Sequence, residues 1–144
     1  GLPVIYYGDE VALAGGSDPD NRRVMPALDA LSDAQAALLD DTRRLATLRR
    51  CLPALRQGLH RAVVASAEHY AYVRDAGDGA PALVVVSTAD EPTTLAIPIA
   101  GALATGPYVD ALGGPGIEVG GDELSLELPP RSIAVYVPAG NACS

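Results

Sequence analysis

The sequence has 144 residues and contains no Lys, Trp or Phe, one Met, and only two residues each of Cys and His. Every basic residue is Arg, and the formal net charge is −8. Because no basic stripe is present, we expect neither nucleic acid nor an anionic membrane surface among the partners. No apolar run approaches the roughly 20 residues that cross a bilayer.

The few cysteines and histidines favour no metal site, and no cofactor is expected. Cys51 and Cys143 lack the spacing of metal ligands, and two thiols do not define a disulfide framework, so the redox compartment stays undetermined. His60 and His69 fall in predicted strands, where solvated positions are more common than metal or base roles. The localisation is also undetermined, because no secretion signal is visible and the chain does not begin with Met.

The first 58 residues combine one short apolar run, a long loop and a helix. Residues 3–7 are rich in β-branched and aromatic side chains and predict a buried strand. Residues 8–31 are rich in Gly, Pro and Asp and predict a loop. Ser32 and Gln35 have the spacing of a capping box, so a helix is expected from there to about Arg50, with Leu38, Leu39, Leu45, Leu48 and Leu52 on its apolar side.

The pattern changes after Gly58 to short β-rich runs separated by turn signals. Glu123–Leu128 alternates between polar and apolar residues, and residues 82–86 are apolar throughout, as a central strand can be. Several short strands at this spacing predict an antiparallel sandwich. The expected strands are 59–66, 69–74, 82–88, 93–97, 108–112, 123–128 and 132–137.

Two motifs near the start of the chain stand close together and in order. Gly1, Pro3, Gly8 and Glu10 fill a Gly-x-Pro-x-x-x-x-Gly-x-Glu pattern, and residues 18–22 read Asp-Pro-Asp-Asn-Arg. This block resembles the last barrel strand of the α-amylase family of glycoside hydrolases and its following Asp-Pro-x-Asn-Arg loop. Residues 48–58 are similar to the segment by which the chain leaves the barrel in that family.

The resemblance implies a fold and a division into domains. A complete (β/α)8 barrel needs roughly 250 residues, so this chain is too short to contain one. We expect an α+β chain: residues 1–58 as the end of a (β/α)8 catalytic barrel, followed by an all-β antiparallel sandwich over residues 59–144. We also expect the chain to be the C-terminal part of a longer enzyme.

No catalytic residue is assigned to this chain. A retaining glycosidase needs a nucleophile and an acid that lie roughly 5 Å apart. If Asp9 and Glu10 continue the strand, their side chains point to opposite faces and do not address one bond together. In the family the catalytic carboxylates come from earlier barrel strands, so the isolated chain is expected to be inactive.

Asp18 and Arg22 are the predicted substrate-binding residues. The resemblance maps them onto a family pair that hydrogen-bonds a glucose unit on the non-reducing side of the cleavage point. A carboxylate accepts from sugar hydroxyls, and a guanidinium donates in a planar fork. The alternative is structural: Asp18 and Asn21 close an Asx-type turn, and Arg22 makes a surface ion pair.

Three further residues, Tyr7, Asp9 and Glu10, are candidates for the barrel rim or for a supporting position behind the substrate contacts. Glu10 is more naturally a residue that holds a loop or an Arg than a catalytic one. Met25-Pro26-Ala27 stands where many relatives have an aromatic residue after Met-x, which leaves the specificity open.

The predicted function is therefore a part of a retaining glycoside hydrolase acting on α-linked glucans, of the α-amylase, cyclomaltodextrinase or neopullulanase-like kind. Its expected partners are an α-glucan or maltooligosaccharide, bound through the whole enzyme, and the rest of the barrel. Two alternatives remain. One is a free-standing sandwich that binds carbohydrate or protein, and the other is a fragment that completes a barrel in trans.

Overall fold

The computed structural model describes residues 3–141 and Cys143, so Gly1 of the first motif lies outside the described residues. The chain divides into two compact units, Gly1–Thr47 and Leu48–Ser144. The first unit holds three short 3-10 helices and most of a long α-helix. The second unit holds the end of that helix, one short helix and eight strands.

The expected strand at residues 3–7 is not formed, and this prediction was wrong. Residues 3–6 have no regular structure, and Val4 and Ile5 are 85% and 57% exposed. A strand is stabilised by hydrogen bonds to a neighbouring strand. Every described strand pairs within residues 59–138, so the apolar run at residues 3–7 has no strand beside it.

The predicted loop at residues 8–31 contains three single-turn 3-10 helices, η1 (Asp9–Val11), η2 (Asp20–Arg22) and η3 (Leu28–Ala30). The turn at η1 begins at Gly8, whose φ of 97° is a left-handed conformation that suits glycine. Val11 closes this turn and is 2% exposed. The segment is therefore an ordered series of turns rather than a featureless connection.

Helix α1 (Asp33–Cys51) begins where the sequence predicts. The Ser32 backbone N–H donates to Gln35 Oε1 at 3.1 Å, and the Gln35 N–H donates to Ser32 Oγ at 3.4 Å, which confirms the capping box. The expected apolar side is buried only at its end, since Leu48 is 6% exposed while Leu38 and Leu45 are 37% and 40% exposed. The earlier turns of α1 thus leave leucines uncovered.

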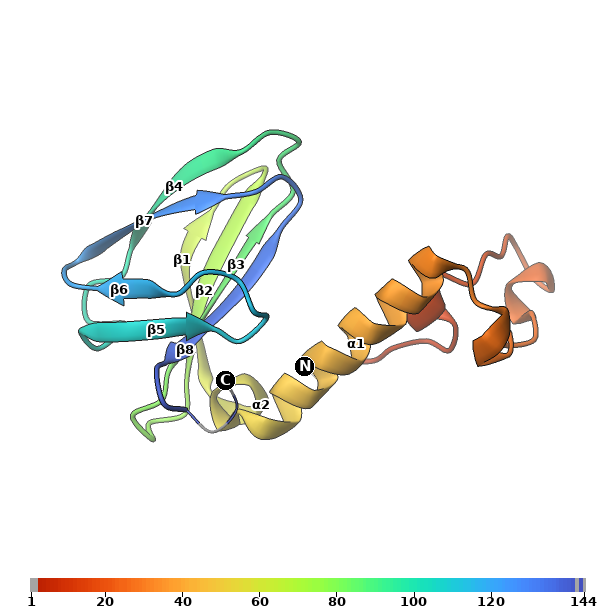
Figure 1. Ribbon diagram of the computed structural model, residues 1–144, viewed down its shortest axis with the longest axis horizontal. Helices are drawn as coiled ribbons and strands as arrows, with labels where there is room; N and C mark the ends of the chain where they lie inside the picture. The colour runs from red at the N-terminus through yellow and green to blue at the C-terminus, as the bar shows by residue number, and fades with distance from the viewer. Residues whose placement is uncertain (1–2, 142, 144) are drawn as a thin grey trace. The chain divides into compact units, whose positions relative to one another are not determined.

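The second unit is the predicted antiparallel sandwich (Figure 1). Its six-stranded sheet has the order β1-β2-β3-β8-β5-β6, and β4 and β7 form a separate pair. The strands are β1 (Leu59–Ala65), β2 (His69–Asp75), β3 (Ala82–Ser87), β4 (Thr93–Pro98), β5 (Gly106–Asp110), β6 (Ile117–Val119), β7 (Glu123–Leu128) and β8 (Ile133–Pro138). Only the short β6 lacks a predicted counterpart.

The core of the sandwich follows the two-residue period of its strands. On β7, Leu124, Leu126 and Leu128 are buried and alternate with exposed residues, as expected. They join a cluster drawn from both sheets that includes Leu83 and Ile97, each 0% exposed. Strand β3 lies between β2 and β8, which explains why its run of apolar residues is buried.

A second hydrophobic cluster packs the end of α1 and helix α2 (Pro53–Gln57) onto the strands. Leu52, Ala54 and Val137 are each at most 1% exposed within it. Arg74 of β2 adds a hydrogen bond from Nε to the Ala54 carbonyl oxygen at 3.3 Å. Residues 48–57 therefore pack against the strands of the second unit.

The structure differs from the sequence-based expectation at the two cysteines and at His69. Cys51 and Cys143 form a disulfide, although their spacing alone did not indicate one. His69 is not solvated but 8% exposed, because it lies on the inward face of β2 with Ala71 and Val73. A position in a strand does not by itself decide which face a histidine occupies.

Candidate functional site

The turn that carries Asp9 and Glu10 binds both carboxylates to its own backbone. Asp9 Oδ2 accepts a hydrogen bond from the Tyr6 N–H at 3.1 Å, and Glu10 Oε2 accepts one from the Gly8 N–H at 2.8 Å. The two residues lie in a 3-10 turn and do not continue a strand, so the argument from opposite strand faces does not apply to them. Their oxygens stabilise the turn.

Tyr7 links this turn to the following loop. Its Oη donates to the Arg23 carbonyl oxygen at 3.2 Å, and the side chain remains exposed. The turn is also fixed to the start of α1, because Gln35 Nε2 donates to the Val11 carbonyl oxygen at 3.0 Å. These contacts order the segment on which the predicted substrate-binding residues lie.

Asp18 and Arg22 form a two-point ion pair across η2. Arg22 Nε lies 3.0 Å from Asp18 Oδ1, and Arg22 Nη2 donates to Asp18 Oδ2 at 3.3 Å. The two side chains are 69% and 61% exposed, so an ion pair here contributes little to stability. The fork nevertheless fixes the orientation of both groups and leaves the other N–H donors of Arg22 facing outward from the pair.

A second two-point ion pair, between Arg23 and Asp20, supports the same loop. It was not predicted from the sequence. Arg23 Nε and Nη2 donate to Asp20 Oδ1 and Oδ2 at 2.9 and 3.0 Å, and the Gly16 N–H donates to Asp20 Oδ2 at 2.8 Å. The Arg23 hydrogen bonds, with that of Gly16, hold the pKa of the Asp20 carboxyl below its ordinary value. The i,i+3 spacing of Asp20 and Arg23 was the signal available in the sequence.

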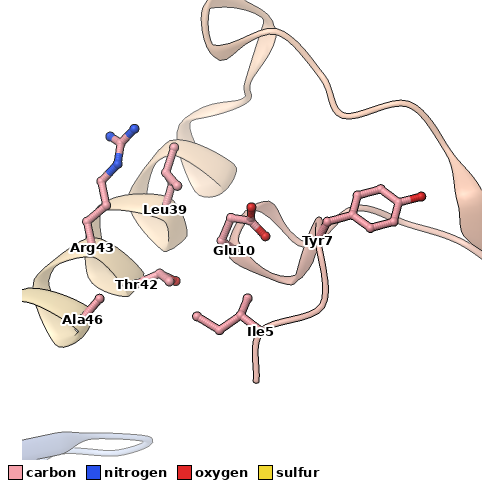
Figure 2. A pocket seen from close by; sticks show the side chains of 7 residues that line it. All are labelled: Ile5, Tyr7, Glu10, Leu39, Thr42, Arg43 and Ala46. Atoms are coloured by element: carbon pink, nitrogen blue, oxygen red, sulfur yellow. The ribbon is translucent and has the colours of Figure 1, made fainter. Parts of the chain in front are cut away.

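An open cleft of about 430 Å³ lies between the η1 turn and α1 (Figure 2). Ile5 and Glu10 line one side, and Leu39, Thr42 and Ala46 line the other. The Tyr7 ring points away from the helix. The lining is mainly apolar, with Glu10 and Arg43 as its charged residues, so it suits packing against another apolar element better than a reaction.

The aromatic residues of β1 and β2 do not form a flat platform. The ring centroids of His60 and Tyr72 are 4.7 Å apart with planes inclined by 32°, and those of Tyr70 and Tyr72 are 5.4 Å apart with planes inclined by 40°, whereas the His60 and Tyr70 rings lie closer to parallel, at 19°. His60 Nε2 lies 2.8 Å from Tyr70 Oη. The rings therefore pack against one another across the strands, as neighbouring aromatic residues commonly do.

Within the described residues, no three His, Cys, Asp or Glu side chains gather where they could hold a metal ion. No described helix is long and apolar enough to cross a membrane. The arrangement offers exposed, oriented hydrogen-bonding groups on an ordered loop, which suits the recognition of a neutral polar ligand.

Comparison with known proteins identifies the family of this chain. No family model matches the chain. Over 117 residues, 79% of this chain, it is 38% identical to a cyclomaltodextrin glucanotransferase from Paenibacillus macerans. The chain belongs to the α-amylase family. An α-amylase structure from Anoxybacillus superposes with a TM-score of 0.81 and 26% identity over 94% of this chain, which agrees with the sandwich described above.

A third relative is a debranching enzyme from Nostoc punctiforme, solved after soaking with acarbose. It is 28% identical over 94% of this chain, with a TM-score of 0.71. This α-amylase-family chain spans only 15% of the P. macerans protein, 28% of the Anoxybacillus chain and 26% of the Nostoc chain. The three relatives carry three different activities, so the similarity defines the family and not one reaction.

Proposed function

We propose that this chain is the C-terminal part of a retaining enzyme acting on α-linked glucans. The observation that carries the proposal is its 38% identity to a glucanotransferase over most of the chain. In this proposal, residues 1–58 complete a catalytic barrel, and residues 59–144 form a stabilising sandwich. The bond-breaking carboxylates lie on other polypeptide of the same enzyme.

The local geometry supports this distribution of roles. A retaining reaction needs one carboxylate free to attack and another carboxyl free to donate a proton. Asp9 and Glu10 instead accept hydrogen bonds from the Tyr6 and Gly8 backbone N–H groups. The uncovered apolar residues of the first unit, Val4, Ile5, Leu38 and Leu45 among them, support a position against the remaining barrel elements.

Asp18 and Arg22 are the proposed glucan contacts of this chain. Both side chains are exposed, and each is held in orientation by the other. A glucose hydroxyl can donate to the carboxylate while a second oxygen accepts from the guanidinium, and the mutual charge pairing suits a neutral sugar. Tyr7, Asp9 and Glu10 position this loop in the proposal and do not react.

The main alternative is a free-standing sandwich that binds carbohydrate. It is supported by one observation, that Leu48–Ser144 forms a compact unit with its own core. Affinity electrophoresis of the purified chain through gels containing amylopectin distinguishes the proposal from this alternative. The proposal expects unchanged mobility and no release of glucose or maltose from maltooligosaccharides. Strong retardation by the polysaccharide favours the binding module, and sugar release by the pure chain contradicts the proposal.

A further inference from the structure

The disulfide joins the two ends of the sandwich unit. Cys51 is the last residue of α1, and Cys143 lies in the segment that follows β8. The two residues are 92 positions apart, and all eight strands lie between them. Their Cα atoms are 5.9 Å apart, within the usual range for a bridged pair. The bond therefore closes the whole sandwich into one covalent ring.

The backbone after β8 turns back toward the end of α1. Gly140 has a φ of 84°, a left-handed conformation that permits the reversal. The Asn141 N–H donates to the Pro138 carbonyl oxygen at 3.1 Å, and the Cys143 N–H donates to Asn141 Oδ1 at 3.0 Å. These short-range contacts direct Cys143 to the second hydrophobic cluster.

Both cysteines lie beside the second hydrophobic cluster. Cys51 stands between Leu48 and Leu52, the two α1-end residues of the second cluster, and Cys143 packs against the same cluster. The bond connects the end of α1 with the segment that follows Pro138. A covalent link between them prevents either from separating from the sheet without the other.

We propose that the Cys51–Cys143 disulfide is a redox-sensitive latch that holds the segment after β8 on the sandwich and sets the thermal stability of that unit. Because the closed loop is long, the bond removes many conformations from the unfolded chain. The latch stays closed where the surroundings are oxidising, and we infer that the protein is stable in such a compartment and weakened in a reducing one.

Opening of the latch is an ordinary thiol–disulfide exchange with a dithiol reductant. One reductant thiolate attacks a sulfur of the bond, forming a mixed disulfide and releasing one cysteine thiolate. The second reductant thiol displaces the other cysteine, and the reductant leaves as a cyclic disulfide. Two electrons pass from reductant to protein, and both cysteines take up a proton. Cys51 is exposed and Cys143 half-buried, so reductant has access.

The test compares the full chain with and without dithiothreitol, beside the double variant Cys51→Ser/Cys143→Ser. Thiol titration of the oxidised, denatured chain should find no free thiol. Reduction should lower the midpoint of thermal unfolding of the sandwich by on the order of 10 °C. The double variant should already melt at the reduced midpoint and should not respond to dithiothreitol.

Two results overturn the latch. One is the finding of two free thiols in chain purified from an oxidising compartment, and the other is an equal midpoint with and without reductant. Where the double variant does not fold, hydrogen exchange on the reduced wild type decides. The latch predicts faster exchange at the Asn141 and Cys143 amides and, because the reduced unit is less stable, faster exchange at the β3 amides too. Unchanged exchange at both amides contradicts it.

Discussion

Ser32 and Gln35 bond to each other reciprocally at the start of α1, each backbone N–H donating to the other side chain. Gln35 also donates from Nε2 to the Val11 carbonyl oxygen. One glutamine thus caps the helix and fixes the η1 turn. The η1 turn is in turn joined to the loop with Asp18 and Arg22 by the hydrogen bond from Tyr7 Oη to the Arg23 carbonyl oxygen.

Ser32→Ala should weaken α1 by about 1 kcal/mol, because the first turn loses the side-chain acceptor for a backbone N–H. The measurement is thermal unfolding followed by circular dichroism at 222 nm, where the midpoint of the helical signal should fall. Ser17→Ala, at an exposed position of the preceding loop, is the matched control and should melt as the wild type does. Equal midpoints for both variants would refute the capping role.

Leu83→Ala should destabilise the sandwich by about 2–5 kcal/mol, since Leu83 is fully buried between the sheets and truncation leaves a cavity. Leu59→Ala is the control from the same sheet, because Leu59 is 83% exposed and its loss should change stability by less than about 0.5 kcal/mol. Urea unfolding followed by tyrosine fluorescence measures both. Similar losses for the two variants would show that the core lies elsewhere.

The ion pair between Asp20 and Arg23 should depend on pH and should be lost as the pH falls. The pKa of Asp20 in the folded chain lies below its ordinary value of 3.8, through Arg23 and then the Gly16 N–H. The contribution of this ion pair to loop order is therefore fully present when the pH is above the ordinary pKa of the carboxyl. It is lost as the pH falls through the lowered pKa. The Gly16 amide resonance should titrate with a midpoint below 3.8.

Arg23→Ala provides the control for this titration. Removal of the guanidinium should move the Gly16 midpoint upward toward the ordinary value, because the largest stabilising contact of the carboxylate is gone. A midpoint at or above 3.8 in the wild type, or no change in the variant, would contradict the assigned cause.

The sandwich was predictable from the sequence because each of its strands shows its pattern within a few neighbouring residues. The alternation at Glu123–Leu128 and the turn residues between the runs determine strand faces and ends without reference to distant residues. The capping box was predictable for the same reason. Strand β6 was missed because Ile117–Val119 is too short to show a period, and its pairing with β5 depends on the rest of the sheet.

The first unit was harder to predict because its structure depends on neighbours. Residues 3–7 carry a strand-like pattern, yet a pattern forms a strand only beside a pairing partner. The ion pair of Asp18 with Arg22 joins residues only four positions apart, whereas the disulfide joins residues 92 positions apart, which no local signal reveals. The glucan-binding role of Asp18 and Arg22 stays a prediction.

We propose that Asp18 and Arg22 contact the glucan in the whole enzyme that contains this chain. Arg22→Ala removes the donor and frees the Asp18 carboxylate from its oriented pair. Arg131→Ala is the matched control, because Arg131 makes an equally exposed pair with Asp90 in the sandwich.

The most direct measurement is the KM of the whole enzyme for maltooligosaccharides with Arg22→Ala beside Arg131→Ala. We expect the KM to rise about tenfold or more in Arg22→Ala, because a charge-assisted hydrogen bond is lost, and to stay at the wild-type value in Arg131→Ala. Wild-type kinetics in Arg22→Ala, or the same rise in both variants, would contradict it.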